Sequence, residues 1–424
     1  MMPDTIPKIL TGGTINMIKR CKFIVALALC LCVFAYDTVS ISSDWGGKSI
    51  AWATDPTFSK NALVLSGQLG LYFYMKDFDT NTAGTMNFDI ANTEADPSID
   101  YKTDMIIKEN SGEQIETQKA KDDNDQDITL HGFRCDVNAI QMADEIIATY
   151  KYTKDSTETT VTNSSTIDSV EDYLNELLKD TTYSTHVNLV ALVNAIKDYG
   201  HFAQKTLADT NTSYGNHTSI AASKNYNADN NDNEEKNFPT TATGLAATDA
   251  IKIYTGDNTT GTPVANNLGI TFTLDLDSKT ALRVYLPKDS KLRQKNTTTE
   301  GSITDMTTTA ATGNTYGTYE INTTNVTTPD SDSEFQIVFS NISAHQLGDI
   351  FTIPVTINNT SYTIVISPMS YVYAVTLLTY EEDMKTSMGL DDNNELTRFK
   401  QAVVALYNYY EKTLAYRKAP TATN

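Results

Sequence analysis

Three blocks of this 424-residue sequence occur twice, in the same order and with nearly the same separation. The pairs are GLYFYMKD at 70–77 with LRVYLPKD at 282–289, AIQMAD at 139–144 with AHQLGD at 344–349, and FAQKTLA at 202–208 with YYEKTLA at 409–415. Their offsets are 212, 205 and 207 residues. Three blocks in one order at nearly one offset are hard to obtain by chance, so we interpret them as an internal duplication.

Each half of the expected duplication begins with strands. Residues 61–77 and 266–289 carry β-branched and aromatic residues at alternating positions, which predicts strands. The shared pattern A-x-Q-[ML]-[AG]-D is expected between two further strands in each half. These strands are expected to begin at Phe133 and Ile146 in the first half and at Phe335 and Phe351 in the second.

Helices are expected to follow the strands in each half. Ser169, followed by acidic residues, is typical of a helix N-cap, and a second helix is expected over about 187–207. Pro368 suits the first turn of a helix in the second half, and a last helix is expected from Glu395. Apolar residues recur at every third or fourth position, so we expect each helix to bury one face against the strands of its own half.

These patterns predict an α+β fold of two homologous, β-rich, sandwich-like modules, each with a packed C-terminal pair of helices. Residues 209–249 are rich in Asn, Asp and Thr and hold few large apolar side chains, so they are expected to be a linker. The expected organisation is a signal peptide at 1–35, modules at 36–208 and 250–418, the linker at 209–249 and a tail at 419–424.

The N-terminal segment is typical of a secretory signal peptide. Lys19, Arg20 and Lys22 precede an apolar run at 23–35, which is too short to span a bilayer comfortably. We expect cleavage after Ala35, with Met17 as a plausible start; the alternative is a buried hydrophobic strand or helix. The mature protein is then expected to be secreted or at the cell surface, without a transmembrane segment.

The net charge and the cysteine content limit the partners and the disulfide bonds that we expect. The formal net charge is −21, which argues against nucleic acid as a partner because phosphate binding requires clustered Lys and Arg. Three of the four cysteines lie within the expected signal peptide, which leaves only Cys135. We therefore expect no intrachain disulfide bond.

Four segments resemble a module of uncharacterised secreted and cell-surface proteins of anaerobic gut Firmicutes. They are LSGQLGLYFYM at 65–75, AIKDYGHFAQ at 195–204, SPMSYVY at 367–373 and ALYNY at 405–409. The resemblance implies a duplicated strand-then-helix fold over most of residues 61–418, often within larger surface or polymer-degrading proteins. It implies no catalytic residues.

Motifs that carry chemistry are scarce in this sequence. It contains no G-x-S-x-G, H-E-x-x-H, Walker A or dinucleotide-binding pattern, and we expect no cofactor. His131 and Cys135 supply only two ligands for zinc, and Cys135 is more simply a small buried residue than a nucleophile. The acidic runs 122–127 and 229–235 lack the Gly and Glu of a calcium loop, and we expect no metal site. Paired carboxylates for sugar hydrolysis stay an open alternative.

Tyrosines crowd the last two expected helices. Those on the apolar stripe are most simply core residues, whereas others offer rings on which a sugar could stack. We take Tyr371, Tyr373, Tyr407 and Tyr409 as candidate ligand-facing aromatics. The leading hypothesis is a secreted, non-enzymatic surface, adhesion or assembly protein whose partner is a polysaccharide or another cell-surface protein. The alternatives are a carbohydrate-binding accessory protein and, third, a glycan-degrading enzyme.

Overall fold

The computed structural model of the chain describes nineteen separate stretches of sequence. These are residues 40–41, 55–64, 69–77, 84–91, 98–100, 115–121, 127–154, 156–164, 167–181, 183–208, 217–223, 239–275, 280–288, 290–294, 307–309, 320–327, 333–340, 342–377 and 393–418. The expected signal peptide, the tail at 419–424 and the acidic runs, apart from Asp127, lie outside the described residues.

The first half contains two antiparallel sheets. One has the order β1-β2-β3-β7-β6 and the other has the order β5-β4-β8-β9. The first is built from β1 (Ser40–Ile41), β2 (Thr57–Val64), β3 (Gly70–Lys76), β7 (Asp127–Asp136) and β6 (Ile115–Lys121). The second is built from β5 (Ser98–Asp100), β4 (Gly84–Ile90), β8 (Ile146–Lys154) and β9 (Thr157–Thr162).

The second half also contains two antiparallel sheets, ordered β11-β12-β16-β15 and β10-β18-β17-β13, with β14 also paired to β17. The first is built from β11 (Thr271–Asp275), β12 (Ala281–Pro287), β16 (Ser333–Ser340) and β15 (Glu320–Thr327). The second is built from β10 (Lys252–Thr255), β18 (Thr360–Ile366), β17 (Ile350–Ile357), β13 (Lys291–Leu292) and β14 (Thr307–Thr309). The order β2-β3-β7-β6 thus recurs as β11-β12-β16-β15, and the pair β8-β9 recurs as β17-β18.

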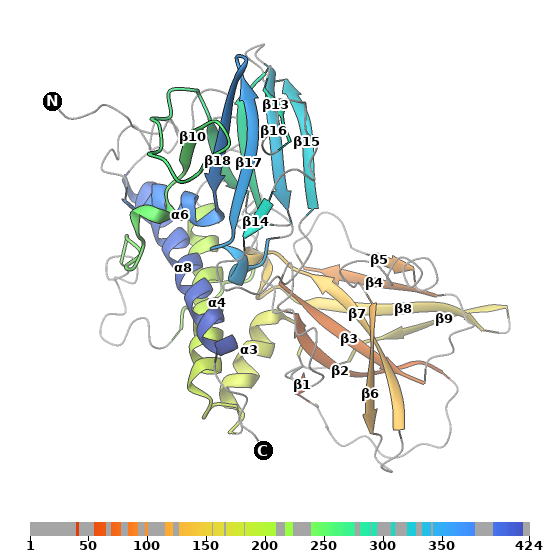
Figure 1. Cartoon of the computed structure of the whole chain (residues 1–424). Coiled ribbons are helices and arrows are strands. Elements are labelled where there is room, and N and C mark those ends of the chain that lie inside the picture. The colour runs from red at the N-terminus through yellow and green to blue at the C-terminus, as the bar shows by residue number, and fades with distance from the viewer. Residues whose placement is uncertain are drawn as a thin grey trace.

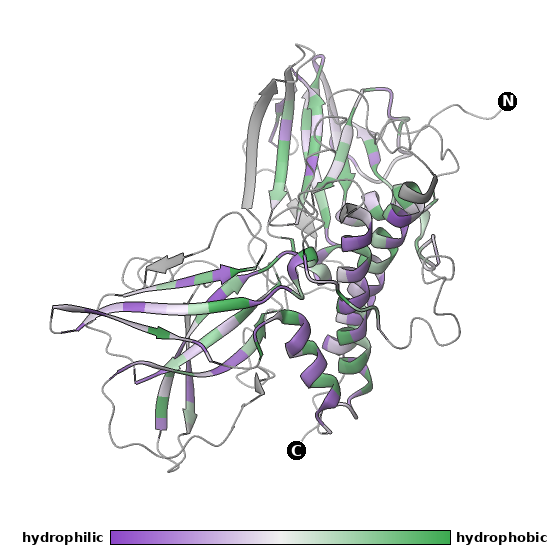
Figure 2. Ribbon diagram, turned by 180° about the vertical axis from the view of Figure 1, so that it is seen from behind, coloured by the Kyte–Doolittle hydropathy of each residue, from purple (hydrophilic) through white to green (hydrophobic). Residues whose placement is uncertain are grey.

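The alternation of residue types along the sequence predicts where these strands lie, but it merges some neighbouring strands into one. Residues 61–77 and 266–289 each hold two antiparallel strands, β2 with β3 and β11 with β12, where one strand-like run was expected. Strand β8 alternates buried and exposed residues, and Figure 2 shows hydrophobic and hydrophilic residues in turn along the strands of this half. Strand β3 is buried on both faces: Leu71, Phe73 and Met75 face the main core, and Tyr72 and Tyr74 face a smaller apolar cluster.

Four helices lie in the described residues: α3 (Val170–Lys179), α4 (Val187–Ala208), α6 (Pro368–Leu377) and α8 (Asn393–Lys418). Ser169 caps α3 as expected, because its hydroxyl accepts a hydrogen bond from the Asp172 amide at 3.1 Å. Ser367 does the same for the Ser370 amide at 3.2 Å, with Pro368 as the first helical residue. None of these helices is long and apolar enough to cross a membrane.

The A-x-Q-[ML]-[AG]-D blocks form short 3-10 turns, η1 (Ala139–Gln141) and η4 (Ala344–Gln346), directly before β8 and β17. In each turn the glutamine side chain closes the corner: Gln141 Oε1 accepts from the Asn138 amide, and Gln346 Oε1 accepts from the Ser343 amide, both at 3.0 Å. The position that we expected for the two blocks, immediately before a returning strand, is therefore confirmed.

Each corner also holds the start of the first helix of its half. The second amide of α3, that of Glu171, donates to the Met142 carbonyl at 2.7 Å. The amide of Met369, the second residue of α6, donates to the Leu347 carbonyl at 2.8 Å. The first-turn amides of a helix have no partner within the helix, so each corner satisfies one of them and fixes where the helix begins.

Helices α4 and α8 pack against each other, which the sequence pattern did not predict. They run antiparallel and lie side by side in Figure 1. Tyr199 and Tyr409 stack with ring centroids 6.2 Å apart, and Thr206 Oγ1 donates to the Arg398 carbonyl at 3.0 Å. Residues 399–407 of α8 are all buried, so this helix buries its whole circumference there and not one face. One continuous apolar core therefore includes residues of both halves.

The Tyr199–Tyr409 pair offers a test of this packing. Both side chains are fully buried, and neither hydroxyl has a hydrogen-bond partner among the described residues. A buried hydroxyl without a partner costs free energy, so Tyr199→Phe and Tyr409→Phe should each leave the free energy of unfolding unchanged or raise it by about 1 kcal/mol. Tyr409→Ala should lower it by about 3–5 kcal/mol, because it opens a cavity between the helices.

Urea unfolding followed by circular dichroism measures both effects. The Phe variants preserve the rings and serve as matched controls for the Ala variant. A clear loss of stability in both Phe variants would show that the hydroxyls are hydrogen-bonded in solution.

Candidate functional site

The candidate ligand-facing tyrosines are mostly core residues. Tyr371, Tyr407 and Tyr409 expose only 6%, 8% and 1% of their surface, and Tyr373 is half-buried. The interpretation of Tyr371, Tyr407 and Tyr409 as stacking platforms is therefore wrong. Tyr407 and Tyr409 are covered because α8 is enclosed by α4, α6 and η4, and Tyr371 lies on α6, which packs against α8 and β11.

His131 and Cys135 do not form a metal pair. Both lie on β7, where residues four apart are separated by roughly 13 Å along the strand, too far to share one ion. Burial raises the pKa of the Cys135 thiol well above its ordinary value, which disfavours the reactive thiolate. Within the described residues no group of three or more His, Cys, Asp or Glu side chains is placed to hold a metal ion.

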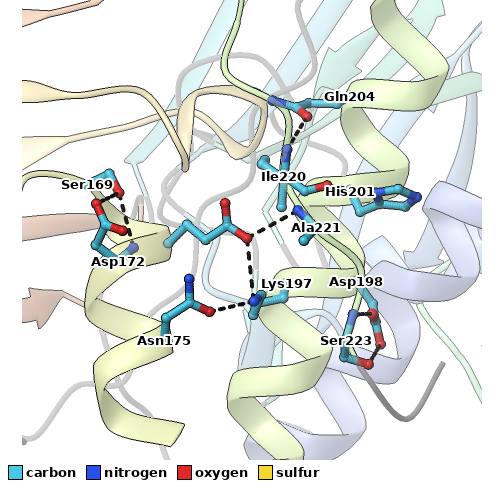
Figure 3. Close-up of polar contacts among 11 residues, drawn as sticks. Ser169, Asp172, Asn175, Lys197, Asp198, His201, Gln204, Ile220, Ala221 and Ser223 are labelled. Carbon is cyan, nitrogen blue, oxygen red and sulfur yellow. Dashed lines mark hydrogen bonds and ion pairs between the residues drawn. The ribbon is translucent and has the colours of Figure 1, made fainter. Parts of the chain in front are cut away.

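A dense set of polar contacts surrounds a short piece of the expected linker. Residues 217–223 (HTSIAAS), which we call the strap, lie against α3, α4 and η1 of the first half (Figure 3). Five side chains of that half bind the strap, and we call them the strap-binding cluster: Asp144, Glu171, Asp198, His201 and Gln204. Residues 217–223 of the expected linker are therefore bound to the first half, and Ile220 and Ser223 are buried.

Main-chain groups of the strap are held at four of its seven residues, namely Thr218, Ile220, Ala221 and Ser223. Gln204 uses both ends of its amide: Oε1 accepts from the Ile220 amide at 2.8 Å, and Nε2 donates to the Thr218 carbonyl at 2.8 Å. His201 Nδ1 donates to the Ile220 carbonyl at 2.8 Å. Because these contacts are made to main-chain groups, they hold the segment in position regardless of its side chains.

Carboxylates hold the remaining amides of the strap. Asp144 Oδ1 accepts from the Thr218 amide at 2.8 Å, and Glu171 Oε1 accepts from the Ala221 amide at 3.1 Å. Asp198 accepts twice from Ser223, from the amide at 2.7 Å and from the hydroxyl at 3.0 Å. Asp144 is fully buried, and its second oxygen accepts from Nδ1 of His217 at 2.5 Å. These three carboxylates thus satisfy three main-chain amides of the strap.

Lys197 balances one of these charges. Its ammonium lies 3.4 Å from Glu171 Oε1 and donates to Asn175 Oδ1 at 2.6 Å. Figure 3 shows the Lys197 and Asn175 side chains between α3 and α4. Lys197 and Glu171 are both buried, so each needs the other as a partner. Burial raises the pKa of Asp198, and the two hydrogen bonds from Ser223 oppose that shift.

Ile220 is the apolar anchor of the strap. It exposes 1% of its surface, whereas Thr218, Ser219 and Ala221 are exposed. Gly200 on α4 makes room for it: a Cβ at this position would lie 3.1 Å from Ile220 Cδ1 and 2.7 Å from Met142 Sδ. The sequence offered one signal for this site, a single large apolar residue within a run of small polar ones, which we included in the linker.

The chemistry available here is recognition of an extended backbone. The carboxylates, amide and imidazole of the strap-binding cluster are each engaged by a main-chain group of the strap. No family model and no curated protein matches this chain.

A pair of acidic residues lies at the start of α3, beside the strap-binding cluster. Burial, together with a hydrogen bond and charge repulsion from Asp172, raises the pKa of Asp168 to about 6. Between about pH 4 and pH 6 the folded protein thus holds a proton that the unfolded chain releases, so stability should fall as the pH rises through this window.

Asp168→Asn tests this carboxyl. The fall in the free energy of unfolding between pH 4.5 and pH 7 should be smaller in the variant than in the wild type, because Asn cannot ionise. Denaturant titrations at several pH values measure it. Glu145→Gln is the control, since Glu145 adds only a weaker charge effect on Asp168. Profiles of Asp168→Asn and wild type that run parallel would contradict the raised pKa.

Gln204→Ala tests the attachment of the strap. The variant loses two hydrogen bonds to the strap and one to the Ile140 carbonyl, so the strap should become a site of cleavage by proteinase K within 217–223. Mass spectrometry of the fragments identifies the cut. Lys205→Ala changes an exposed neighbour on the same helix and should leave the cleavage rate at the wild-type value.

Proposed function

We propose that this chain is a secreted, non-enzymatic protein of a cell surface or an extracellular assembly, built from a duplicated module. The observation that carries the proposal is the use of the clustered charged side chains. The three carboxylates of the strap-binding cluster bind the chain's own backbone, and this arrangement suits attachment of a chain segment better than attack on a substrate.

The duplication is supported by detail beyond the repeated sequence. The order of four strands recurs, as does the order of the two that follow η1 and η4. The corner hydrogen bonds recur at matched residues, and so do the helix caps at Ser169 and Ser367. Each sheet of the described strands draws on one half only, and two sheets per half agree with a sandwich-like module.

Carbohydrate binding is a less favoured proposal. It depended mainly on exposed tyrosine rings, and three of the four candidates are buried. The partner classes that we propose therefore rank another cell-surface protein above a polysaccharide.

Export and inertness toward glycans can be tested with the full chain. When it is expressed in a bacterium with a working secretion system, the protein in the medium or at the cell surface should begin at Tyr36 by N-terminal sequencing. Leu29→Arg with Leu31→Arg interrupts the apolar run and should block export, as the matched control. Exported protein that retains residues 1–35 would contradict the signal peptide.

The exported protein should release no reducing sugar from a panel of polysaccharides. Release of reducing ends would contradict a non-enzymatic role. Retention on one polysaccharide without hydrolysis would favour the carbohydrate-binding alternative over a protein partner.

A further inference from the structure

The strap is bound in the way that a receptor binds an extended peptide. Side chains of α3 and α4, together with Asp144 just after η1, satisfy its backbone, and a single apolar side chain, Ile220, enters the protein. No described residue of the strap belongs to a helix or strand. Peptide-recognition sites combine these same features, namely backbone hydrogen bonds for affinity and a pocket for one side chain for specificity.

Apart from Asp144, which recurs as Asp349 in the repeated block, the fold does not require the residues of the strap-binding cluster. Under the offset of 207 residues that aligns the last helices, the second half has Ala405 in place of Asp198 and Glu411 in place of Gln204. The same offset places Val404 at the position of Lys197, and matching the helix caps Ser169 and Ser367, an offset of 198, places Met369 at the position of Glu171. Met369 and Val404 are both buried and apolar. Replacing a buried ion pair by apolar residues is often neutral for stability, so a second unit with the same strand order folds without the polar set.

Four of the five residues of the cluster have no like residue in the second half: Glu171, Asp198, His201 and Gln204 correspond to Met369, Ala405, Asn408 and Glu411. The polar residues that only one half contains therefore have a purpose beyond folding. We propose that the strap-binding cluster is a peptide-recognition site whose ligand is residues 217–223 of a second copy of this chain, exchanged between copies. This inference rests on the proposed function, since it names the partner through which an assembly forms. The occupant is chosen because this very segment fits the site, with its anchor and its main-chain groups satisfied.

The lengths of the connections permit exchange. Residues 209–216 join α4 to the strap, and residues 224–238 join the strap to residue 239. A chain reaches at most about 3.5 Å per residue, so these connections can extend to roughly 28 Å and roughly 50 Å. An exchanged strap makes the same contacts as a bound one, which is why exchange of an identical element is a low-cost route to dimers.

Within one copy, the strap competes with the strap of a second copy for the strap-binding cluster. Its short connection gives it an effective concentration on the order of millimolar. Exchange should therefore be favoured where copies are crowded, as on a surface, or where the strap of one copy cannot bind. The second condition can be created by mutation.

Two complementary variants test the proposal. The first, Ile220→Asp, has a defective strap and an intact strap-binding cluster. The second, Asp198→Ala with Gln204→Glu, has an intact strap and carries at these positions the residues that the second half has. Each alone should elute as a monomer in size-exclusion chromatography with light scattering. Their mixture at about 100 μM should form a one-to-one dimer, detected by the same measurement and by native mass spectrometry.

A labelled peptide of residues 215–225 tests recognition without dimer formation. It should bind Ile220→Asp at least tenfold more tightly than it binds the doubly substituted variant, and a peptide with Ile220→Asp should not bind either. If Ile220→Asp fails to fold by circular dichroism, Ile220→Ala replaces it, because this change keeps every backbone contact and removes only most of the anchor.

The outcomes separate the steps of the inference. Absence of peptide binding to a folded strap-defective variant up to about 1 mM overturns the recognition site. Peptide binding with no dimer in the mixture overturns the second copy as the partner. Neither result depends on export or on glycan hydrolysis, so a failure here is distinguishable from a failure of the proposed function.

Discussion

The packing of α4 against α8 is the constraint on which the rest of the structure depends. Each helix follows the strands of its own half, yet each is buried largely by the other, so neither half completes its core alone. The stacked rings of Tyr199 and Tyr409 mark the centre of this contact. Because α4 is fixed on one side by α8, its other side is available to η1, α3 and the strap, which is how the strap-binding cluster obtains a rigid base.

The two corner turns show how short polar sequences direct a fold made mostly of strands. A glutamine side chain closes each turn, and the following carbonyl receives an amide from the first turn of a distant helix. These bonds satisfy groups that burial would otherwise leave without partners. The same backbone-satisfying chemistry reappears in the strap, where Gln204, His201 and three carboxylates perform for an irregular segment what a neighbouring strand performs in a sheet.

Local features of the fold were predictable from the sequence, and long-range ones were not. Alternation located β8 and β17, and Ser169 and Pro368 located two helix starts, because these signals lie within a few residues of the structure they specify. Periodicity shows that a helix has an apolar face but not what that face packs against. We therefore expected α8 to pack on the strands of its own half, whereas it packs on α4. For the same reason Tyr407 and Tyr409 were taken as exposed. The attachment of the strap was not predicted, because the side chains that bind it lie up to 74 residues away along the chain.

Antiparallel packing of two corresponding helices is the geometry that a two-fold axis produces between identical subunits. If the halves are copies, a single ancestral module could have paired through this helix as a homodimer, with its association dependent on concentration. Joining the two genes would make that association permanent and fix its stoichiometry. It would also release the subunits from identity, since a substitution in one would no longer appear in both. The first half has the ion pair of Glu171 and Lys197 where the second half has Met369 and Val404. This is the kind of divergence that such a fusion permits.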